Sequence, residues 1–166
     1  MKDVLSSQSM LKDFLAAMFR RMPARMRRFL SRFSQPRFTA TAGAVIIDDQ
    51  DRVLLLEHVF RAGSGWGVPG GFVLAGEQPE AALRRELREE VGLELEQIEI
   101  AFVRVLRTPK HIEIVFRGRA KGEARPISLE VKSAVWFSLD ALPETLPDDQ
   151  RRIIIRALDD GAKRPE

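Results

Sequence analysis

The sequence has no cysteine and only two histidines among its 166 residues. Without cysteine the chain has no disulfide, no thiol nucleophile and no cysteine-ligated zinc site. The two histidines, His58 and His111, are not spaced as a ligand pair, and neither Ser-x-x-Lys nor Gly-x-Ser-x-Gly occurs. We therefore expect no side chain of the protein to act as a covalent nucleophile, and the lack of cysteine fits a cytoplasmic location.

Long apolar runs are missing too, since none approaches the roughly 20 residues that a membrane-spanning helix needs. The length allows one domain, alone or with an appendage. The net charge of +3 is unevenly placed: residues 1–38 hold nine Lys and Arg against two Asp, a charge of +7, and the rest carries −4. The basic character therefore belongs to an N-terminal arm, and it says little about the body of the protein.

Apolar residues in the arm (residues 1–37) recur at helical spacing, which predicts a helix over residues 9–22. Pro23 should end it, and a second short helix should follow. The second helix sets an apolar side against arginines: Met26, Phe29, Leu30 and Phe33 against Arg25, Arg27, Arg28 and Arg32. We expect both helices to pack on the domain or on a second subunit, as in a homodimer. Contact with an anionic membrane surface and an Arg-rich transit peptide are the less favoured alternatives.

The remaining chain reads as one domain over residues 38–160, followed by a frayed tail at 161–166. Strands are expected at 38–47, 52–59, 98–106, 112–120 and 134–139, with the first two forming a hairpin around a turn at 48–51. A glycine-rich loop covers 60–67. A closing helix over 148–159 should turn Ile153, Ile154, Ala157 and Leu158 inward. Strands before and after a central helix predict an α/β fold with a mixed sheet between helices.

That central helix lies in the stretch from Gly71 to Leu93, GFVLAGEQPEAALRRELREEVGL. Pro79 suits its first turn and Gly92 its C-terminal end. Leu83, Leu87 and Val91 form its apolar stripe, and three carboxylates follow one edge of that stripe: Glu86, Glu89 and Glu90. Like charges at this spacing repel each other, and a hard divalent cation that takes oxygen ligands would remove the repulsion.

The same stretch matches the Nudix box, Gly-x5-Glu-x7-Arg-Glu-U-x-Glu-Glu-x-Gly-U with U apolar, at every position. A chance match in a chain of this length is on the order of one in a million. The chain therefore resembles the Nudix hydrolases over residues 38–160. The resemblance implies an α/β/α sandwich, Mg²⁺ or Mn²⁺ as cofactor, and hydrolysis of a phosphoanhydride by metal-activated water.

The resemblance also implies roles for residues of the box and of the loop before it. Glu86 and Glu90 look like the principal metal ligands, together with the Gly70 carbonyl. Glu89 looks like a further ligand or the group that orients water, and Arg85, four residues before it, can hold its carboxylate. Glu77, with Gly71, resembles the part of the box that braces the loop against the helix.

A further carboxylate in the family comes from a later loop, as ligand or general base. Glu130 stands in a similar place, and Glu113 and Glu123 are the alternatives. Trp66 and Phe60 could stack on a base or cap the core. Arg61 and Arg107 could contact phosphates or be merely solvated.

The box fixes the chemistry and leaves the substrate open. Pro109 lies where ADP-ribose pyrophosphatases of the family often have proline, and the stretch from Leu106 to Ile112 could form one wall of a cleft. We therefore expect a small-molecule nucleotide substrate, ADP-ribose or an ADP-sugar, and no nucleic-acid partner. A (d)NTP pyrophosphatase that cleans the nucleotide pool and a non-catalytic nucleotide-binding sensor are the alternatives.

Overall fold

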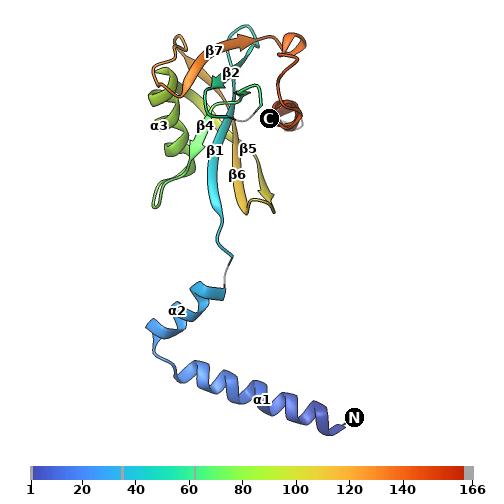
Figure 1. Ribbon diagram of the computed structural model, residues 1–166. Helices are drawn as coiled ribbons and strands as arrows, with labels where there is room; N and C mark the ends of the chain where they lie inside the picture. The colour runs from blue at the N-terminus through green and yellow to red at the C-terminus, as the bar shows by residue number, and fades with distance from the viewer. Residues whose placement is uncertain (1, 35, 62, 163–166) are drawn as a thin grey trace. The chain divides into compact units, whose positions relative to one another are not determined.

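A computed structural model describes residues 2–34, 36–61 and 63–162 (Figure 1). Contacts divide the chain into two compact units, Met1–Arg37 and Phe38–Glu166. The first unit holds helices α1 (Lys2–Arg21) and α2 (Ala24–Ser34). In the described residues no helix is long and apolar enough to cross a membrane.

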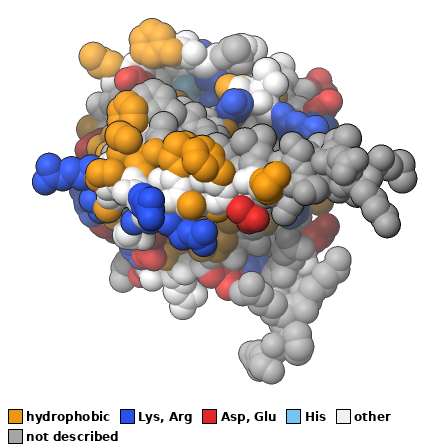
Figure 2. All heavy atoms as spheres, turned by 90° about the horizontal axis from the view of Figure 1, so that it is seen from below, with side chains coloured by type: hydrophobic (Ala, Val, Ile, Leu, Met, Phe, Trp, Pro, Cys, Tyr) orange, Lys and Arg blue, Asp and Glu red, His pale blue; other side chains and the backbone are white. Residues whose placement is uncertain are grey.

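Helix α1 starts seven residues before the predicted position, because residues 2–8 contain no proline or glycine that would stop a helix. Its side chains Met10, Phe14 and Met18 follow one another at four-residue spacing and are all exposed. Met26 and Phe29 of α2 are exposed as well. In the face that Figure 2 presents, hydrophobic side chains gather in a band beside lysine and arginine side chains.

The second unit is built on a mixed sheet, as predicted. Its strands are β1 (Thr39–Ile47), β2 (Val53–His58), β3 (Trp66–Gly67), β4 (Gly70–Phe72), β5 (Glu94–Leu106), β6 (His111–Lys121) and β7 (Val131–Phe137). The order is β3-β2-β1-β6-β5, with β4 paired to β1 and β7 paired to β2. Strands β1 and β6 run parallel, and the other pairs are antiparallel.

The predicted hairpin between the first two strands is largely absent. Strand β2 pairs with β1 at one position, Ile47 with Val53, and pairs along its whole length with β7. The turn between them is fixed locally, because Asp48 accepts hydrogen bonds from the backbone N–H groups of Gln50 and Arg52. The strand boundaries differ most at β5, which begins at Glu94, and at β7, which spans Val131–Phe137, and the short strand β3 lies at the end of the stretch 60–67 that was expected to be a loop. Sequence periodicity reports on each strand alone, so it does not reveal the distant partner of β2.

Helices α3 (Pro79–Val91) and α4 (Asp148–Ala162) cover opposite faces of the sheet (Figure 1), and a short 3-10 turn spans Leu139–Ala141. Alternate residues of the strands feed two separate cores. Leu83, Leu87 and Val91 of α3 pack with one set, which includes Ala44, Ile46, Leu54 and Leu56. Ile153, Ile154 and Ala157 of α4 pack with the other, which includes Val45, Leu55 and Val115. The predicted α/β/α sandwich is confirmed.

Removal of residues 1–33 should leave the second unit folded, because the two units are compact by themselves. We expect the truncated protein to keep its cooperative thermal unfolding but to change its oligomeric state or solubility, since the apolar side of the arm would be lost. Size-exclusion chromatography with light scattering measures the molar mass of the full-length and the truncated protein. A monodisperse truncated protein of unchanged stoichiometry would show that the arm is not a packing element.

Candidate active site

Helix α3 carries Glu80 in its first turn and the three predicted acids Glu86, Glu89 and Glu90 further along, and its ends are built as the sequence predicts. Pro79 occupies the first turn, and Gly92 ends the helix with φ +68° while its N–H bonds the Arg88 carbonyl at 3.2 Å. The apolar stripe draws one side of the helix into the core. The side chains of Glu86 and Glu90 are only 19% and 9% exposed, whereas that of Glu89 is 61% exposed.

Gly70, directly before the box, and Gly71, its first residue, bring backbone against this helix, and we call this pair of residues the glycine loop. A Cβ at Gly71 would overlap the carboxylate of Glu86, and a Cβ at Gly70 would overlap the backbone of Ala42 on β1. Gly70 also has φ +152°, which side chains rarely adopt. The glycine loop therefore reaches the carboxylate of Glu86 more closely than a loop with side chains could.

Arg85 ties the loop to the helix through several carboxylates. Its guanidinium donates to both oxygens of Glu77 at 3.0 Å and to Glu86 at 2.8 Å. The expected pairing of Arg85 with Glu89 is a longer contact of 3.5 Å, so Glu77 and Glu86 are the principal partners. Glu77 also accepts from the Leu74 N–H at 3.0 Å, and the hydrogen bond from Arg85 holds the pKa of Glu77 below its ordinary value. This double pairing keeps Glu86 in place beside the glycine loop.

Glu90 is a buried acid among other acids. Burial raises its pKa to about 7, with further upward contributions from the charges of Glu86, Glu130 and Glu89, while Arg61 acts in the opposite direction. Its Oε2 has no hydrogen-bond partner among the described residues. A buried carboxylate oxygen without a hydrogen-bond partner costs free energy, so binding of a cation to this oxygen would be favoured.

His58 lies beside Glu90, with 3.6 Å between its Nδ1 and the Oε1 of that acid. Burial, and then the charge of Arg61, lowers the pKa of His58 to about 4. At neutral pH the ring is therefore uncharged, and the contact is not an ion pair. Sequence reasoning missed this neighbour, because only the position of β2 brings His58 to the end of α3.

A divalent cation fits this donor set, although no three acidic or histidine side chains in the described part of the chain already enclose a metal site. The partnerless oxygen of Glu90 and the accumulation of Glu86, Glu89 and Glu130 around it supply excess negative charge. All of these donors are oxygens, as Mg²⁺ and Mn²⁺ prefer.

The three candidates for the later carboxylate lie in different surroundings. The loop before Glu130 bonds to the end of α3, where the N–H of Ile127 donates to the Glu90 carbonyl at 2.8 Å. Glu113 is paired with Arg104, and Glu123 with Arg125 in an exposed loop. Among these three, Glu130 is the one whose charge contributes to the raised pKa of Glu90.

The four residues expected to contact substrate are not gathered in one place. Trp66 packs edge-on against Phe137, with ring centroids 5.4 Å apart, in the core beneath α4. Phe60 is 82% exposed, and Arg107 is exposed in the turn between β5 and β6. Arg61 is largely buried near Glu90 and Glu113, and burial lowers its pKa. Its Nη1 has no hydrogen-bond partner among the described residues, so the solvated alternative does not hold for Arg61.

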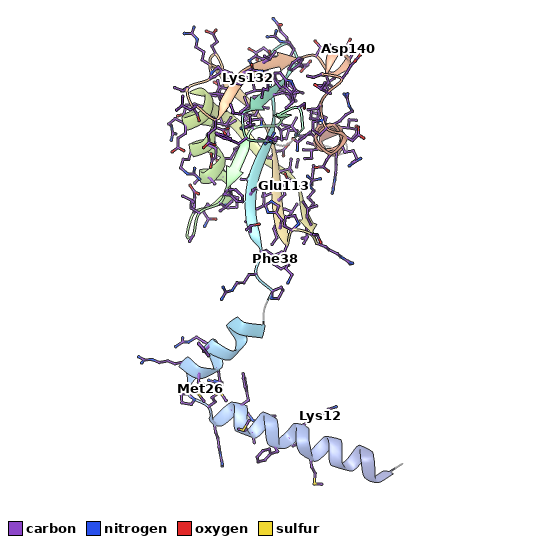
Figure 3. The ribbon with its side chains drawn as sticks, in the orientation of Figure 1. Lys12, Met26, Phe38, Glu113, Lys132 and Asp140 are labelled. Atoms are coloured by element: carbon purple, nitrogen blue, oxygen red, sulfur yellow. The ribbon has the colours of Figure 1, made fainter. Side chains whose placement is uncertain are left out.

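Arg61 lines a cavity of about 210 Å³, which we call the glycine-loop cavity. Gly70 and Gly71 form one side of it, and Thr41, His111, Glu113 and Gln150 contribute to the others. Glu113, labelled in Figure 3, belongs to β6. Of the stretch from Leu106 to Ile112, which was expected to wall a cleft, His111 lines this cavity, whereas Pro109 is exposed in the turn.

The raised pKa of Glu90 predicts how the metal-free protein responds to pH. Because its folded-state pKa of about 7 exceeds the ordinary 4.5, the folded protein binds the proton more tightly, so stability falls as pH rises through 7. Between pH 6.5 and 8.0 we expect a loss of roughly 1 kcal/mol in the free energy of unfolding. Below pH 6.5 protonation of His58 in the unfolded chain opposes the effect, since its folded-state pKa is lowered.

Urea denaturation in EDTA at pH 6.5 and 8.0 measures this loss, with Glu90→Gln as the matched variant. The variant should show a flatter dependence on pH and should be at least as stable as the wild type at pH 8.0. Saturating Mg²⁺ should remove the loss, because the cation binds the ionised carboxylate. Equal slopes in the two proteins would contradict the assignment of the titrating group to Glu90.

Comparison with known proteins agrees with this architecture. A family model described as the NUDIX domain matches residues 37–157. The NAD-capped RNA hydrolase NudC of Pseudomonas aeruginosa is 36% identical over 117 residues, which are 70% of this chain and 41% of that protein. A MutT-like protein of Streptomyces ambofaciens is 28% identical over 127 residues, which are 76% of this chain and 80% of that protein.

Among solved structures, the MutT NUDIX hydrolase from Burkholderia pseudomallei superposes with a TM-score of 0.64 at 29% identity. The match covers 73% of this chain and 98% of that one. By contrast, the chain spans only about two-fifths of the length of the NudC relative. The matched family model covers the sheet, helix α3, helix α4 as far as Ala157, and the acids Glu86, Glu89, Glu90 and Glu130, and the chain belongs to the Nudix family.

Proposed function

We propose that the protein hydrolyses a phosphoanhydride bond in a nucleoside diphosphate linked to a second group, with a divalent cation as cofactor. The observation that carries the proposal is the buried carboxylate of Glu90, whose Oε2 has no partner among the described residues and which lies among other acids. Hydrolysis of such a bond needs positive charge beside the phosphates, and the acids of α3 would bind that charge.

In this proposal Glu86, Glu90 and the Gly70 carbonyl hold the cation. When bound, the cation polarises the phosphate and makes a water molecule acidic enough to act near neutral pH. Glu89, which is exposed, serves as a further ligand or orients the attacking water. Glu130 is the favoured general base. Arg85 and Glu77 keep Glu86 in position, since Arg85 is bonded to both.

The favoured substrate is ADP-ribose or an ADP-sugar. A diphosphate between two sugars offers two flanking groups, and binding energy from both can be used in the transition state. The buried guanidinium of Arg61, beside the glycine loop, is suited to a phosphate. The exposed position of Pro109 gives no added support. An RNA end also becomes a candidate substrate, because the NudC relative is named for hydrolysis of NAD-capped RNA, and NAD is a diphosphate between two riboses.

Two other functions remain as alternatives. A (d)NTP pyrophosphatase would use the same acids but release pyrophosphate. A non-catalytic sensor would bind a nucleotide without turnover. The sensor is the less favoured, because every glutamate of the box is kept in this chain.

Replacement of either proposed ligand, as Glu86→Gln or Glu90→Gln, should lower kcat by about 100-fold or more while the fold stays intact. Steady-state kinetics with Mg²⁺ measures the loss, and thermal unfolding checks the fold. The matched control is Glu94→Gln, because that carboxylate also pairs with an arginine but is exposed. Near-normal turnover by a well-folded Glu90→Gln protein would contradict the metal assignment.

A substrate screen should show ADP-ribose or a related ADP-sugar turned over better than any (d)NTP. The products should be AMP and a sugar phosphate, because attack occurs within the P–O–P bridge. Ion-exchange chromatography separates them, and NAD and NAD-capped RNA belong in the same screen. Pyrophosphate and a nucleoside monophosphate from a preferred (d)NTP would instead favour the pool-cleaning function, and no turnover of any compound would favour the sensor.

A further inference from the structure

The glycine-loop cavity lies on the α4 side of the sheet, whereas Glu86, Glu89 and Glu90, which we call the acidic cluster, belong to α3. Thr41 of β1 and Glu113 of β6 are paired in register, and the residues two positions further along, Gly43 and Val115, are paired in the same way. Val115 belongs to the core beneath α4, and side chains two residues apart share a face. The polar row of Thr41 and Glu113 therefore continues the face that α4 covers.

Glu113 is held at the cavity by a chain of charged groups. Arg104, its register partner on β5, donates to the Oε2 of Glu113. The other nitrogens of Arg104 donate to both oxygens of Asp149 at 2.8 and 2.7 Å, which ties β5 to the first turn of α4. These hydrogen bonds raise the pKa of Arg104, so it stays charged. The carboxylate of Glu113 is thus a fixed hydrogen-bond acceptor, and the charge of Arg104 balances its own.

His111 is fixed just as firmly. Its Nδ1 lies 2.7 Å from the hydroxyl of Thr39 and its Nε2 lies 2.7 Å from that of Thr41. Since both ring nitrogens are engaged by hydroxyls, His111 is poorly placed to take a proton from a substrate. Its role at the cavity is to orient the hydroxyl of Thr41.

The cavity suits a small neutral group with hydroxyls next to a phosphate. Its volume of about 210 Å³ is below the roughly 300–1,000 Å³ of pockets that enclose a drug-sized ligand. Among the described residues it is lined by no Phe, Trp or Tyr, and its one aromatic ring is the imidazole of His111, whose nitrogens are held by the hydroxyls of Thr39 and Thr41. Arg61 supplies a cation beside the glycine loop, and Glu113 supplies an acceptor. A ribose carries vicinal hydroxyls next to its phosphate, and a carboxylate can accept a hydrogen bond from a ribose hydroxyl.

We propose that the glycine-loop cavity binds a ribose of the substrate, and that Glu113 accepts a hydrogen bond from its 2′-hydroxyl and thereby selects ribose over 2-deoxyribose. A test of this inference by turnover rests on the proposed function. A test by binding affinity does not, because the residues that carry the inference lie outside the acidic cluster.

Three compounds test the inference: ADP-ribose, its analogue deoxygenated at the 2′ position of the adenosine, and its analogue deoxygenated at the 2-position of the terminal ribose. For the wild type, kcat/KM should fall about tenfold or more with one of the two analogues, since a hydrogen bond to a charged acceptor is lost. Glu113→Gln should bring the ratio between ADP-ribose and that analogue close to one. Glu94→Gln, the matched control, should keep the wild-type ratio.

Calorimetric titration of the same compounds in EDTA gives the second readout. The wild type should bind one deoxy analogue more weakly than ADP-ribose, and Glu113→Gln should bind both alike. Discrimination in binding without any turnover would support the cavity assignment and sink the proposed function. Turnover of all three compounds with equal kcat/KM by the wild type would overturn the cavity assignment and leave the proposed function standing. Thermal unfolding of Glu113→Gln is the folding control, because the substitution weakens the pairing with Arg104.

Discussion

The burial of one carboxylate, that of Glu90, constrains the rest of this domain. The residue is 7% exposed, and its Oε2 has no hydrogen-bond partner among the described residues. The apolar stripe of α3 forces the burial, because Glu90 directly precedes Val91 of that stripe and follows Leu87 by three positions. Packing of the helix and charge at the site therefore cannot be separated, because the part of α3 that Leu87 and Val91 anchor in the core also turns Glu86 and Glu90 inward.

Two arrangements keep this charged helix in place without a bound ion. Arg85 neutralises Glu77 and Glu86 together, and it also donates to the Phe72 carbonyl at 3.1 Å. The charge of Arg61 acts on Glu90 and lowers its pKa, against the larger effect of burial. Both cations belong to the protein, so the acids are already partly compensated in the folded state. A cation at Glu90 then removes the remaining repulsion instead of having to organise the loop.

The sequence alone was enough to predict the features that depend only on neighbouring residues. Helix α3 has the predicted start at Pro79 and the predicted end before Gly92, since caps and apolar spacing are properties of one short stretch. The sequence did not reveal the pairing of β2 with β7, which brings His58 to Glu90, or the contact of Arg104 with Asp149, 45 residues apart. Nor did it distinguish Arg61 from Arg107, because burial depends on the loop that folds over Gly67. Contacts between distant segments carry no periodic signal.

In the proposed function, the acids of α3 hold the cation and the cavity on the other face of the sheet binds part of the substrate, and this division follows from strand geometry. Successive side chains of β1 and β6 point to opposite faces, so polar residues on the α4 face can change without touching the residues that pack against α3. Two segments meet both sides. Gly71 lies against Glu86 and, with Gly70, also lines the cavity, and Arg61 lines the cavity while its charge interacts with Glu90 and Glu113. In the proposed function, a diphosphate bound beside these glycines would lie between the acids of α3 and the cavity. Because the acids and the cavity are built on different faces, the proposed function allows substrate choice to change at the cavity while the acids of α3 stay the same.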